Sequence, residues 1–187
     1  DTLLGLSFSV SPLSFFQVNP VQTEVLYQTG LDFADLKGHE TVADLYCGAG
    51  TISLLLARKA KRVIGIEIVP QAIEDARKNA LANGIENVQF HAAAAEEMLP
   101  RLVQQGLKMD VVMLDPPRKG CEEKVLESIC QCGPEKVVYI SCDVATQARD
   151  AKYLCAHGYK AVRCQSVDMF CLTGHIENVL LFVKEME

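Results

Sequence analysis

The chain changes its hydrophobic pattern after Gly38, from an irregular lead-in to an alternation of short apolar runs and longer amphipathic stretches. The apolar runs predict strands at residues 41–46, 62–68, 87–91, 110–114 and 136–141. The stretches between and after them predict helices at residues 51–60, 70–83, 96–105, 122–130 and 145–157. A strand–helix order repeated in this way predicts a parallel sheet with helices on both faces.

The last part of the chain breaks this order. Residues 159–168 and 176–184 have the pattern of two strands joined by a short connection, which predicts an antiparallel pair. A parallel, doubly wound sheet that ends in a β-hairpin is typical of class I methyltransferases. We therefore expect an α/β, Rossmann-like fold of that class.

The first 37 residues form a lead-in that we expect to contribute to the active site of one globular unit, residues 38–187. Residues 6–10 alternate as a strand does and Pro12 ends the run, while Pro20 is expected to open a helix. The helix residues expected to face inward are Val21, Val25 and Leu26.

Composition narrows the class of protein. With 187 residues, of which 49% are hydrophobic, the chain is long enough for one domain with a substantial core. No apolar stretch approaches the length of a membrane helix and no basic-then-apolar leader opens the chain, so we expect a cytoplasmic protein without a membrane partner. Eight cysteines without any Cys-x-x-Cys spacing, and four scattered histidines, indicate reduced thiols and no metal site. Nothing in the sequence indicates an oligomeric state.

The net charge of −6 argues against tight binding of a polyanion by this domain alone, because phosphate contacts need Lys and Arg. The basic cluster at Arg58, Lys59, Lys61 and Arg62 is interpreted as a solvated helix end. If nucleic acid is the partner, we expect another domain to supply part of the affinity.

The segment from Asp44 to Thr51 joins the first predicted strand of the alternating region to its helix and carries Gly48 and Gly50. Glycines let the backbone approach a ligand closely, and the start of the helix offers free N–H groups. Glu67, 17 residues after Gly50, ends the next strand, where a carboxylate can accept hydrogen bonds from both hydroxyls of a ribose.

Two details favour S-adenosylmethionine over a dinucleotide as the ligand of this loop. Ser53 occupies the position of the third glycine in a Gly-x-Gly-x-x-Gly fingerprint. Asp44 ends the strand just before the loop, where a carboxylate suits the cationic groups of S-adenosylmethionine better than a pyrophosphate.

Cys142 lies where the run Tyr139-Ile140-Ser141 stops, at the carboxyl edge of the predicted sheet, and not inside the run as a structural cysteine would. Open α/β folds place their ligands at this edge, so Cys142 is a candidate nucleophile beside a bound cofactor. The turn from Asp115 to Arg118, with two prolines, follows another strand and is stiff enough to hold a planar heterocycle near a methyl donor.

A functional and a purely structural interpretation are both possible for Glu177, Phe15, Phe16 and Asn19. Glu177 enters an apolar strand, either as a functional carboxylate or as a solvated charge on an edge strand, and the pattern favours neither. Phe15 and Phe16 are more typical of a core than of a base-stacking platform. Asn19 is interpreted as a helix cap.

Taken together, these segments resemble the RNA 5-methyluridine methyltransferases, which act on uridines of transfer and ribosomal RNA, over residues 15–183. The matching motifs occur in the family's order: Phe16-Gln17-Val18-Asn19, Asp44-Leu45-Tyr46-Cys47-Gly48-x-Gly50, Asp115-Pro116-Pro117-Arg118-Lys119-Gly120, Ser141-Cys142-Asp143 and His175-Ile176-Glu177.

The resemblance implies a covalent route to C5 of uracil, which is too poor a nucleophile to take a methyl group directly. It implies that Cys142 adds to C6, that Glu177 removes the C5 proton, and that Asp115 holds the uracil edge near the cofactor. The cofactor contacts that it implies are Gln17, Tyr46, Thr51, Glu67, Ala94 and Asp115, beside the loop glycines Gly48 and Gly50. Because a free thiol ionises near pH 8.5, Cys142 needs help from Arg118, backbone amides or the next helix.

Three departures from the family's pattern stand out. Ala94 replaces a polar residue, so contact with adenine there is expected from the backbone, and Val144 replaces the proline that usually follows Asp143. The family also carries an amino-terminal RNA-binding β-barrel, so this chain is interpreted as an excised catalytic domain.

Other classes of function remain open at this point. Methyltransferases of exocyclic base nitrogens or of protein glutamine also use an Asp/Asn-Pro-Pro turn, but usually with an aromatic residue where this chain has Arg118. A 5-methylcytosine enzyme would carry a second cysteine near the turn, and Cys121 lies too far along. A non-catalytic RNA-binding module would have no reason to keep both Cys142 and Glu177.

Overall fold

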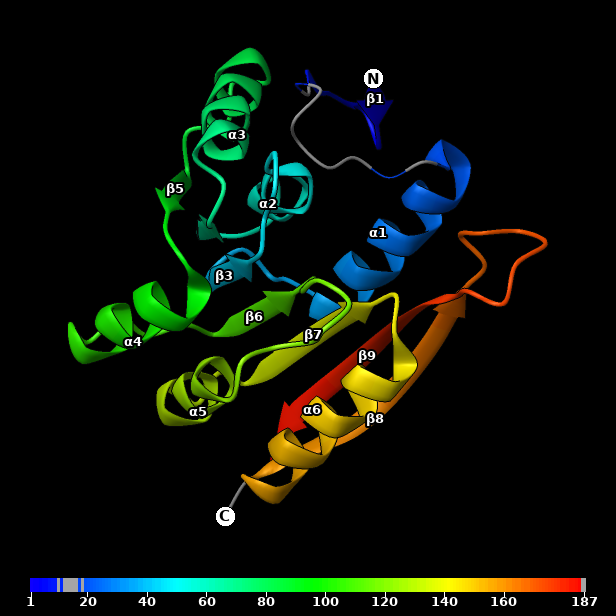
Figure 1. Ribbon diagram of the computed structural model, residues 1–187. Helices are drawn as coiled ribbons and strands as arrows, with labels where there is room; N and C mark the ends of the chain where they lie inside the picture. Colours follow the sequence, from blue (N-terminus) through cyan, green and yellow to red (C-terminus); the bar gives the residue numbers. More distant parts are fainter. Residues whose placement is uncertain (10, 12–16, 18, 186–187) are drawn as a thin grey trace.

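The computed structural model describes residues 1–9, 11, 17 and 19–185, and its centre is one seven-stranded sheet (Figure 1). The order of the strands across the sheet is β5-β4-β3-β6-β7-β9-β8. Five strands are parallel, and β9 pairs antiparallel with both β7 and β8. The bounds are β3 Thr41–Leu45, β4 Arg62–Glu67, β5 Val88–Ala92, β6 Val111–Leu114, β7 Lys136–Ser141, β8 Tyr159–Val167 and β9 Glu177–Lys184.

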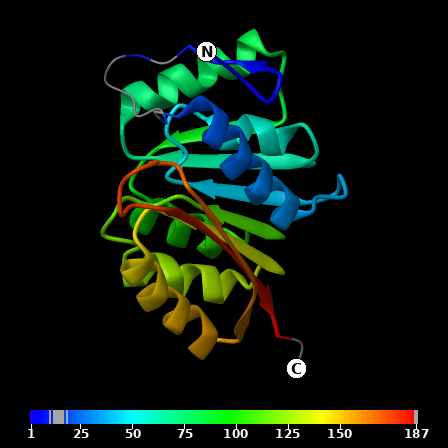
Figure 2. The same cartoon turned by 90° about the vertical axis from the view of Figure 1, so that its right-hand side faces the viewer.

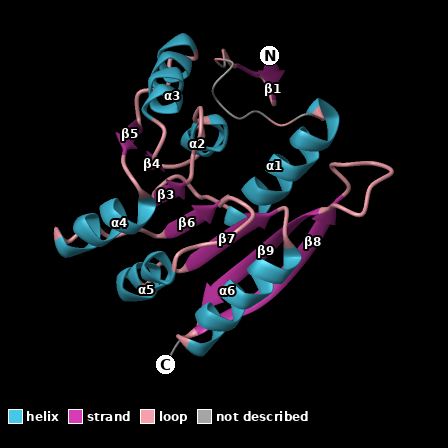
Figure 3. Ribbon diagram, in the orientation of Figure 1, coloured by secondary structure: helices cyan, strands magenta, loops and turns pink. Residues whose placement is uncertain are grey.

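Helices cover both faces of this sheet. Buried side chains of α1, α2 and α3 form one core with the sheet, and those of α4, α5 and α6 form the core on the other face. The helix bounds are α1 Pro20–Ala34, α2 Thr51–Ala57, α3 Pro70–Ala82, α4 Ala95–Gln104, α5 Glu123–Cys132 and α6 Val144–Ala156. Helix and strand alternate until the final pair of strands, β8 and β9 (Figure 3).

The expected fold class is therefore confirmed: a mostly parallel, doubly wound sheet ends in an antiparallel hairpin. Strand β7 has the predicted bounds, and the largest difference among the helices is α2, which ends at Ala57 and not at residue 60. No helix in the part of the chain that the structure describes is long and apolar enough to cross a membrane.

The inward face of α1 differs from the prediction. Val21 and Val25 are 71% and 47% exposed, whereas Leu26 is fully buried as expected. The helix packs on the sheet through Leu26 and Gly30, and a side-chain atom at Gly30 would meet Met113 and Ile140 at 3.5 Å. Leu26, Tyr27 and Phe33 are larger than valine and form the buried face of α1, so the two valines face the solvent.

The lead-in is a small hairpin in place of the predicted strand at residues 6–10. Strands β1 (Thr2–Leu3) and β2 (Leu6–Ser7) pair antiparallel, while Val10 and Pro12 lie outside the described residues. This hairpin lies against α3 (Figure 2). The basic cluster is exposed, as expected for a solvated helix end; its residues are Arg58, Lys59, Lys61 and Arg62.

Side chains of α3 hold the backbone that leaves this hairpin. The N–H groups of Ser7, Ser9 and Ser11 donate to Asn83, Asn79 and Asp75 at 2.9, 2.8 and 3.0 Å. Asp75, Asn79 and Asn83 lie four residues apart, on one face of α3 and its C-cap. Asn79 also donates to the carbonyl of Ala49 at 3.2 Å. It therefore joins the lead-in to the loop after β3.

We expect Asn79→Ala to lower the free energy of unfolding by about 1–3 kcal/mol, because it leaves the amide of Ser9 and the buried carbonyl of Ala49 without partners. Chemical denaturation followed by circular dichroism measures this. The adjacent Lys78→Ala, at an exposed position of the same helix, is the control and should change stability by no more than about 0.5 kcal/mol. Equal effects of the two substitutions would contradict the bridging role of Asn79.

Candidate active site

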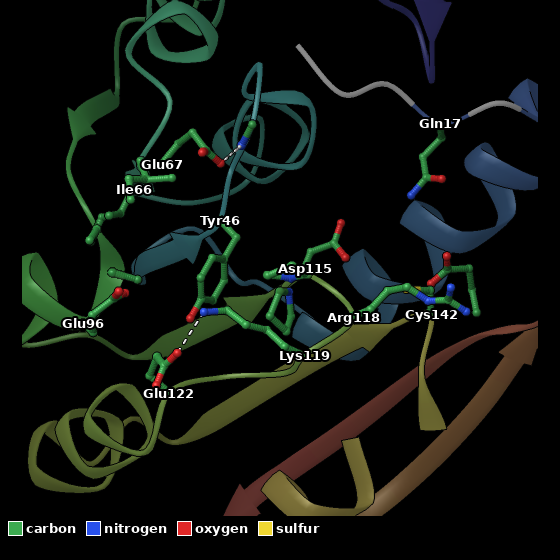
Figure 4. Close-up of a pocket in the computed structure, with 17 residues that line it drawn as sticks. Gln17, Tyr46, Ile66, Glu67, Glu96, Asp115, Arg118, Lys119, Glu122 and Cys142 are labelled. Atoms are coloured by element: carbon green, nitrogen blue, oxygen red, sulfur yellow. Dashed lines mark hydrogen bonds and ion pairs between the residues drawn. The ribbon is translucent and has the colours of Figure 1, made fainter. Parts of the chain in front are cut away.

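The loops after β3, β6 and β7 meet at the carboxyl edge of the sheet, together with the ends of β4 and β9 (Figure 4). Strand β3 is the point at which the chain switches from one half of the sheet to the other, and ligands of open α/β sheets bind outside such a point. A pocket of about 520 Å³ lies there. The predicted site residues that line it are Gln17, Tyr46, Gly48, Glu67, Ala94, Asp115, Cys142 and Glu177.

Two predicted cofactor residues lie outside this lining. Thr51 lines a small adjoining cavity of about 40 Å³, which shares Tyr46, Gly48 and Asp115 with the larger pocket. A Cβ at Gly50 would lie 2.9 Å from the Cβ of Ala76, so this glycine makes room for α3. At Gly48, by contrast, no atom lies within 4 Å of such a Cβ, and the backbone is open to a ligand.

The loop after β3 is held in an unusual conformation. Tyr46 has a φ of 67°, and its N–H and that of Cys47 both donate to the carbonyl of Ile66, at 2.8 and 3.0 Å. This left-handed conformation is uncommon for a residue other than glycine and requires support from its surroundings. The two hydrogen bonds give that support and aim Tyr46 into the pocket.

Glu67 ends β4 with its carboxylate held by two backbone amides. Gly48 donates to Oε2 at 3.1 Å and Val69 donates to Oε1 at 2.9 Å. Each carboxylate oxygen can accept a further hydrogen bond. The oriented, half-buried carboxylate therefore has acceptor capacity left for a pair of hydroxyl groups, as the sequence predicts for a ribose.

Asp44 lies behind the loop and lines neither of the two cavities. It is fully buried, and its Oδ2 accepts a hydrogen bond from Ser53, the residue at the position of a third glycine. Its Oδ1 has no partner among residues 1–9, 11, 17 and 19–185. Burial raises the pKa of Asp44 to about 7, with a further contribution from Glu67. The contact between Asp44 and a cationic group stays a prediction.

Gln17 brings the lead-in to the pocket. It is only 7% exposed, its amide points into the pocket (Figure 4), and its Oε1 has no partner within the described part of the chain. Phe15, Phe16 and Val18 lie outside the described residues. Asn19 caps α1 by accepting from the amide of Gln22 at 3.3 Å, as predicted.

Cys142 and Glu177 are brought together by the pairing of β7 with β9. Ser141 and Asn178 are the last register pair of this ladder, so Cys142 leaves β7 next to the point at which Glu177 begins β9, and both residues line the pocket. Glu177 is 3% exposed, because β9 lies between β7 and β8. The interpretation of Glu177 as a solvated charge on an edge strand is therefore wrong.

Burial changes the acidity of the groups in this pocket. It raises the pKa of Asp115 to about 8, with Glu177 and Asp44 adding to the effect, and it also raises the pKa of Glu177. Burial and the Glu177 carboxylate raise the pKa of the Cys142 thiol, while the Arg118 guanidinium opposes them. Two of the carboxyl groups thus hold protons more tightly than usual. The Cys142 thiol receives two of the forms of help that the sequence suggested, from Arg118 and from a backbone hydrogen bond at Cys142 itself.

The start of α6 fixes Cys142 from its other side. Asp143 caps this helix by accepting from Ala145 and Thr146, at 3.1 and 3.0 Å, and these amides lower its pKa. Val144, 56% exposed, is the first helical residue, a position at which a proline is also tolerated. Hydrogen bonds around Asp143 provide the rigidity that the absent proline would add.

Several residues of the lining were not found from the sequence. Ile68 is 62% exposed and forms an apolar wall with Ile66. Lys119 and Glu122 form an ion pair of 2.8 Å at another part of the lining. The one signal in the sequence for these residues was Ile68 itself, an apolar residue directly after Glu67 at the end of a predicted strand. No group of three metal-ligating side chains occurs in the described ranges, and all eight cysteines are unpaired.

A doubly wound sheet with an open glycine, an oriented acidic strand end and an apolar wall in one pocket defines a class I methyltransferase fold with a nucleoside-type site. The orphaned Oε1 of Gln17 and the open backbone at Gly48 fit a bound S-adenosylmethionine. The donor set is thus compatible with the predicted cofactor.

Comparison with known proteins agrees with this class. The model of the tRNA (uracil-5-)-methyltransferase family matches residues 8–185, so the chain belongs to that family. It is 54% identical over 181 residues to an uncharacterized RNA methyltransferase of Clostridium tetani and 55% identical over 179 residues to one of Listeria innocua. The matches cover 97% and 96% of this chain but 39% and 40% of those relatives. The chain thus spans about two fifths of their length.

A solved structure shows the same arrangement. The tRNA (uracil-54, C5)-methyltransferase of Pyrococcus abyssi, in complex with S-adenosyl-L-homocysteine, superimposes with a TM-score of 0.84 and is 30% identical. The superposition covers 98% of this chain and 43% of that one. The likeness therefore includes the whole sheet and its helices.

The raised pKa of Asp115 predicts a pH-dependent stability. An aspartate ionises near pH 3.9 in the unfolded chain but near pH 8 here, so the unfolded state loses its proton first and stability falls as the pH rises between these values. Between about pH 5 and pH 7, the free energy of unfolding of the wild type should fall relative to Asp115→Asn, by at most about 1.4 kcal/mol per pH unit. Urea denaturation at several pH values measures it.

Asp143→Asn provides the control, because the pKa of Asp143 is lowered and its own titration lies below this pH range. Its stability difference from the wild type should stay constant between about pH 5 and pH 7. A flat profile for Asp115→Asn as well would show that Asp115 ionises normally in the folded protein.

Proposed function

We propose that this chain is the catalytic domain of an enzyme that transfers a methyl group from S-adenosylmethionine to C5 of a uridine in transfer or ribosomal RNA. The observation that carries the proposal is the juxtaposition of Cys142 and Glu177 at paired strand ends, in one pocket with Gly48 and Glu67. Family membership supports the uracil C5 specificity. The net charge of −6, and the two fifths of the relatives' length that the chain spans, support a further domain that supplies RNA affinity.

The cofactor would be held by side chains and backbone that the pocket already orients. Glu67 accepts hydrogen bonds from the ribose, Gly48 allows close approach of the backbone, and Ala94 provides backbone contact near the start of α4. Gln17, Tyr46, Thr51 and Asp115 complete the set, and Gly50 shapes the loop. S-adenosylmethionine, when bound, supplies the electrophilic methyl group that the activated C5 accepts.

Residues of the chain activate the uracil ring for methylation and then release it. The Cys142 thiolate bonds to C6, and the electron pair of the C5–C6 double bond moves toward C5 and the adjacent carbonyl. Asp115, which keeps its proton near neutral pH, can donate a hydrogen bond to a uracil carbonyl and so hold the ring. After C5 is methylated, the Glu177 carboxylate removes the C5 proton. The double bond then re-forms and the thiolate leaves.

Burial suits Glu177 to this last step. Removal of a proton from carbon needs a base stronger than a solvated carboxylate, and burial raises the pKa of Glu177. A methyltransferase of exocyclic base nitrogens would have no use for this pair, because an amino nitrogen attacks without prior addition of a thiol.

The first test is Cys142→Ala, which should reduce methylation of uridine-containing RNA by at least about a thousandfold, since no other group can add to C6. Transfer of labelled methyl groups from S-adenosylmethionine measures it, and cofactor affinity should stay within about twofold of the wild type because Cys142 makes no predicted contact with the cofactor. Cys155→Ala, which removes an exposed thiol of α6, is the matched control and should be fully active. Methylation by Cys142→Ala at the wild-type rate would exclude the covalent route.

The second test separates the nucleophile from the base. In the Glu177→Gln variant, Cys142 should still add to C6 and C5 should still accept the methyl group. The amide cannot remove the C5 proton, so a covalent protein–RNA adduct should accumulate. Denaturing electrophoresis after incubation with S-adenosylmethionine and labelled RNA detects the adduct. Glu74→Gln, on the exposed side of α3, is the control and should leave no adduct. Normal turnover by Glu177→Gln would assign the base to another residue.

A trapping experiment tests both residues at once. With RNA that contains 5-fluorouridine, the wild type should stop as a Cys142 adduct after methyl transfer, because fluorine cannot leave as a cation. An adduct absent in Cys142→Ala would support the nucleophile and the substrate class together. If neither the wild type nor the protein with an added RNA-binding domain forms an adduct, the proposal fails in favour of an exocyclic-nitrogen methyltransferase.

A further inference from the structure

Arg118 occupies a special place among the residues around the pocket. It follows the two prolines of the turn after β6, lines the same pocket as Cys142 and Glu177, and reaches toward Cys142 (Figure 4). The other basic residue of the lining is Lys119, which is paired with Glu122 at 2.8 Å. Of the two cations in the lining, Arg118 is therefore the one that faces the thiol.

The backbone around Arg118 is tied to the helix that begins beside Cys142. The hydroxyl of Thr146 lies 3.0 Å from the carbonyl oxygen of Arg118 and 3.1 Å from that of Asp143. One side chain thus spans the two loops that carry Arg118 and Cys142. Their separation is set by covalent geometry and short hydrogen bonds.

A second set of contacts fixes the rest of this loop on α6. Arg149 donates to the carbonyl of Lys119 at 3.0 Å, and the amide of Cys121 donates to Asp150 at 2.8 Å. Gly120 has a φ of 77°, and a Cβ there would lie 2.6 Å from the guanidinium of Arg149. The loop cannot shift along α6 without breaking these contacts.

The side chain of Arg118 is held from the opposite direction. Its Nη2 lies 3.2 Å from Nδ1 of His175, two residues before Glu177. A guanidinium can only donate, so Nδ1 accepts and the imidazole proton lies on Nε2. His175 therefore keeps the guanidinium at the mouth of the pocket, between the loop after β6 and the start of β9.

The charges that face Cys142 come from two elements, the start of β9 and the turn after β6. Burial and the carboxylates of Glu177 on β9 and Asp115 after β6 raise the pKa of the thiol, and Arg118 is the charged side chain that lowers it. Without this cation, the thiolate would form beside carboxyl groups in a half-buried site with no opposite charge nearby.

We propose that Arg118 is a positioning residue whose guanidinium, held by His175, stabilises the Cys142 thiolate and sets its reactivity. The use of that thiolate rests on the proposed function, but its ionisation is a property of the free protein. The interaction is electrostatic: the thiol proton passes to the solvent, and no bond forms between the two side chains.

The test is the rate at which Cys142 is alkylated by iodoacetamide as a function of pH. In this reaction a sulfur–carbon bond forms and iodide leaves, and the rate follows the thiolate fraction. Mass spectrometry of the peptide that contains Cys142 measures the rate. The exposed Cys155 in the same molecule is the internal reference.

Arg118→Gln should slow alkylation of Cys142 by about threefold to tenfold near pH 8 and move its pH profile to higher pH, with Cys155 unchanged. Arg118→Lys should restore part of the rate, because it keeps the charge without the planar donor pair. Lys119→Gln is the matched control: it removes the same charge one residue away and should change the rate by less than about twofold.

The hydrogen bond to His175 is tested with two further variants. His175→Leu removes the acceptor and should slow alkylation of Cys142 in the same direction as Arg118→Gln. His175→Asn offers an amide oxygen in place of Nδ1 and should stay near the wild-type rate. Such a difference between the two variants would not arise if His175 served only to fill space.

An unchanged pH profile in Arg118→Gln, or equal slowing by Lys119→Gln, would overturn the assignment. The trapping experiment with 5-fluorouridine RNA and wild-type protein keeps the two proposals apart. If neither the wild type nor the protein with an added RNA-binding domain forms an adduct, but Arg118→Gln alone slows alkylation, the proposed function fails and the role of Arg118 stands. An adduct in the wild type with no effect of Arg118→Gln gives the opposite result.

Discussion

The antiparallel pairing of β9 with β7 is the constraint on which the site depends. It takes the last strand of the chain into the sheet, between β7 and β8, and so buries Glu177 in the pocket that Cys142 also lines. The side chains of Asn178 and Gln147 secure this register, because Asn178 donates to Gln147 at 2.7 Å while Gln147 donates to the carbonyl of Tyr139 at 2.9 Å. A slip of one residue would turn Glu177 to the other face of the sheet.

The same pairing concentrates carboxyl groups where water is scarce. Asp115 and Glu177 both hold protons more tightly than solvated carboxyls do, and Asp44 behind the loop adds to the effect on Asp115. Such an arrangement is unfavourable for stability, because each of these carboxyl groups is harder to ionise here than in the unfolded chain, and perturbed groups of this kind are typical of functional sites. Arg118 provides a positive charge at the mouth of this acidic pocket. Its position depends on both the stiff turn after β6 and the strand that carries Glu177.

The sequence was sufficient for features that depend on local pattern. The alternation of strands and helices, the loop at Gly48 and the end of the run before Cys142 are visible in neighbouring residues alone. The sequence did not predict properties that depend on packing between distant elements. The burial of Glu177 follows from the insertion of β9 between β7 and β8. The exposure of Val21 follows from the way α1 packs on the sheet. Ile68 was missed because an isoleucine at the end of a predicted strand is equally typical of a residue in the core, and its exposure is visible only in the structure.

The attachment of the lead-in to α3 has a consequence for the loop after β3. Ser7, Ser9 and Ser11 are held by side chains of one helix, whereas the sheet beneath is held by continuous backbone ladders. Leu3 and Phe8 of the lead-in are also buried in the core on that face of the sheet. The described lead-in is therefore held both by side-chain hydrogen bonds and by apolar burial. Because Asn79 bonds Ser9 and Ala49 at once, a change at this one residue reaches the lead-in and the loop after β3 together.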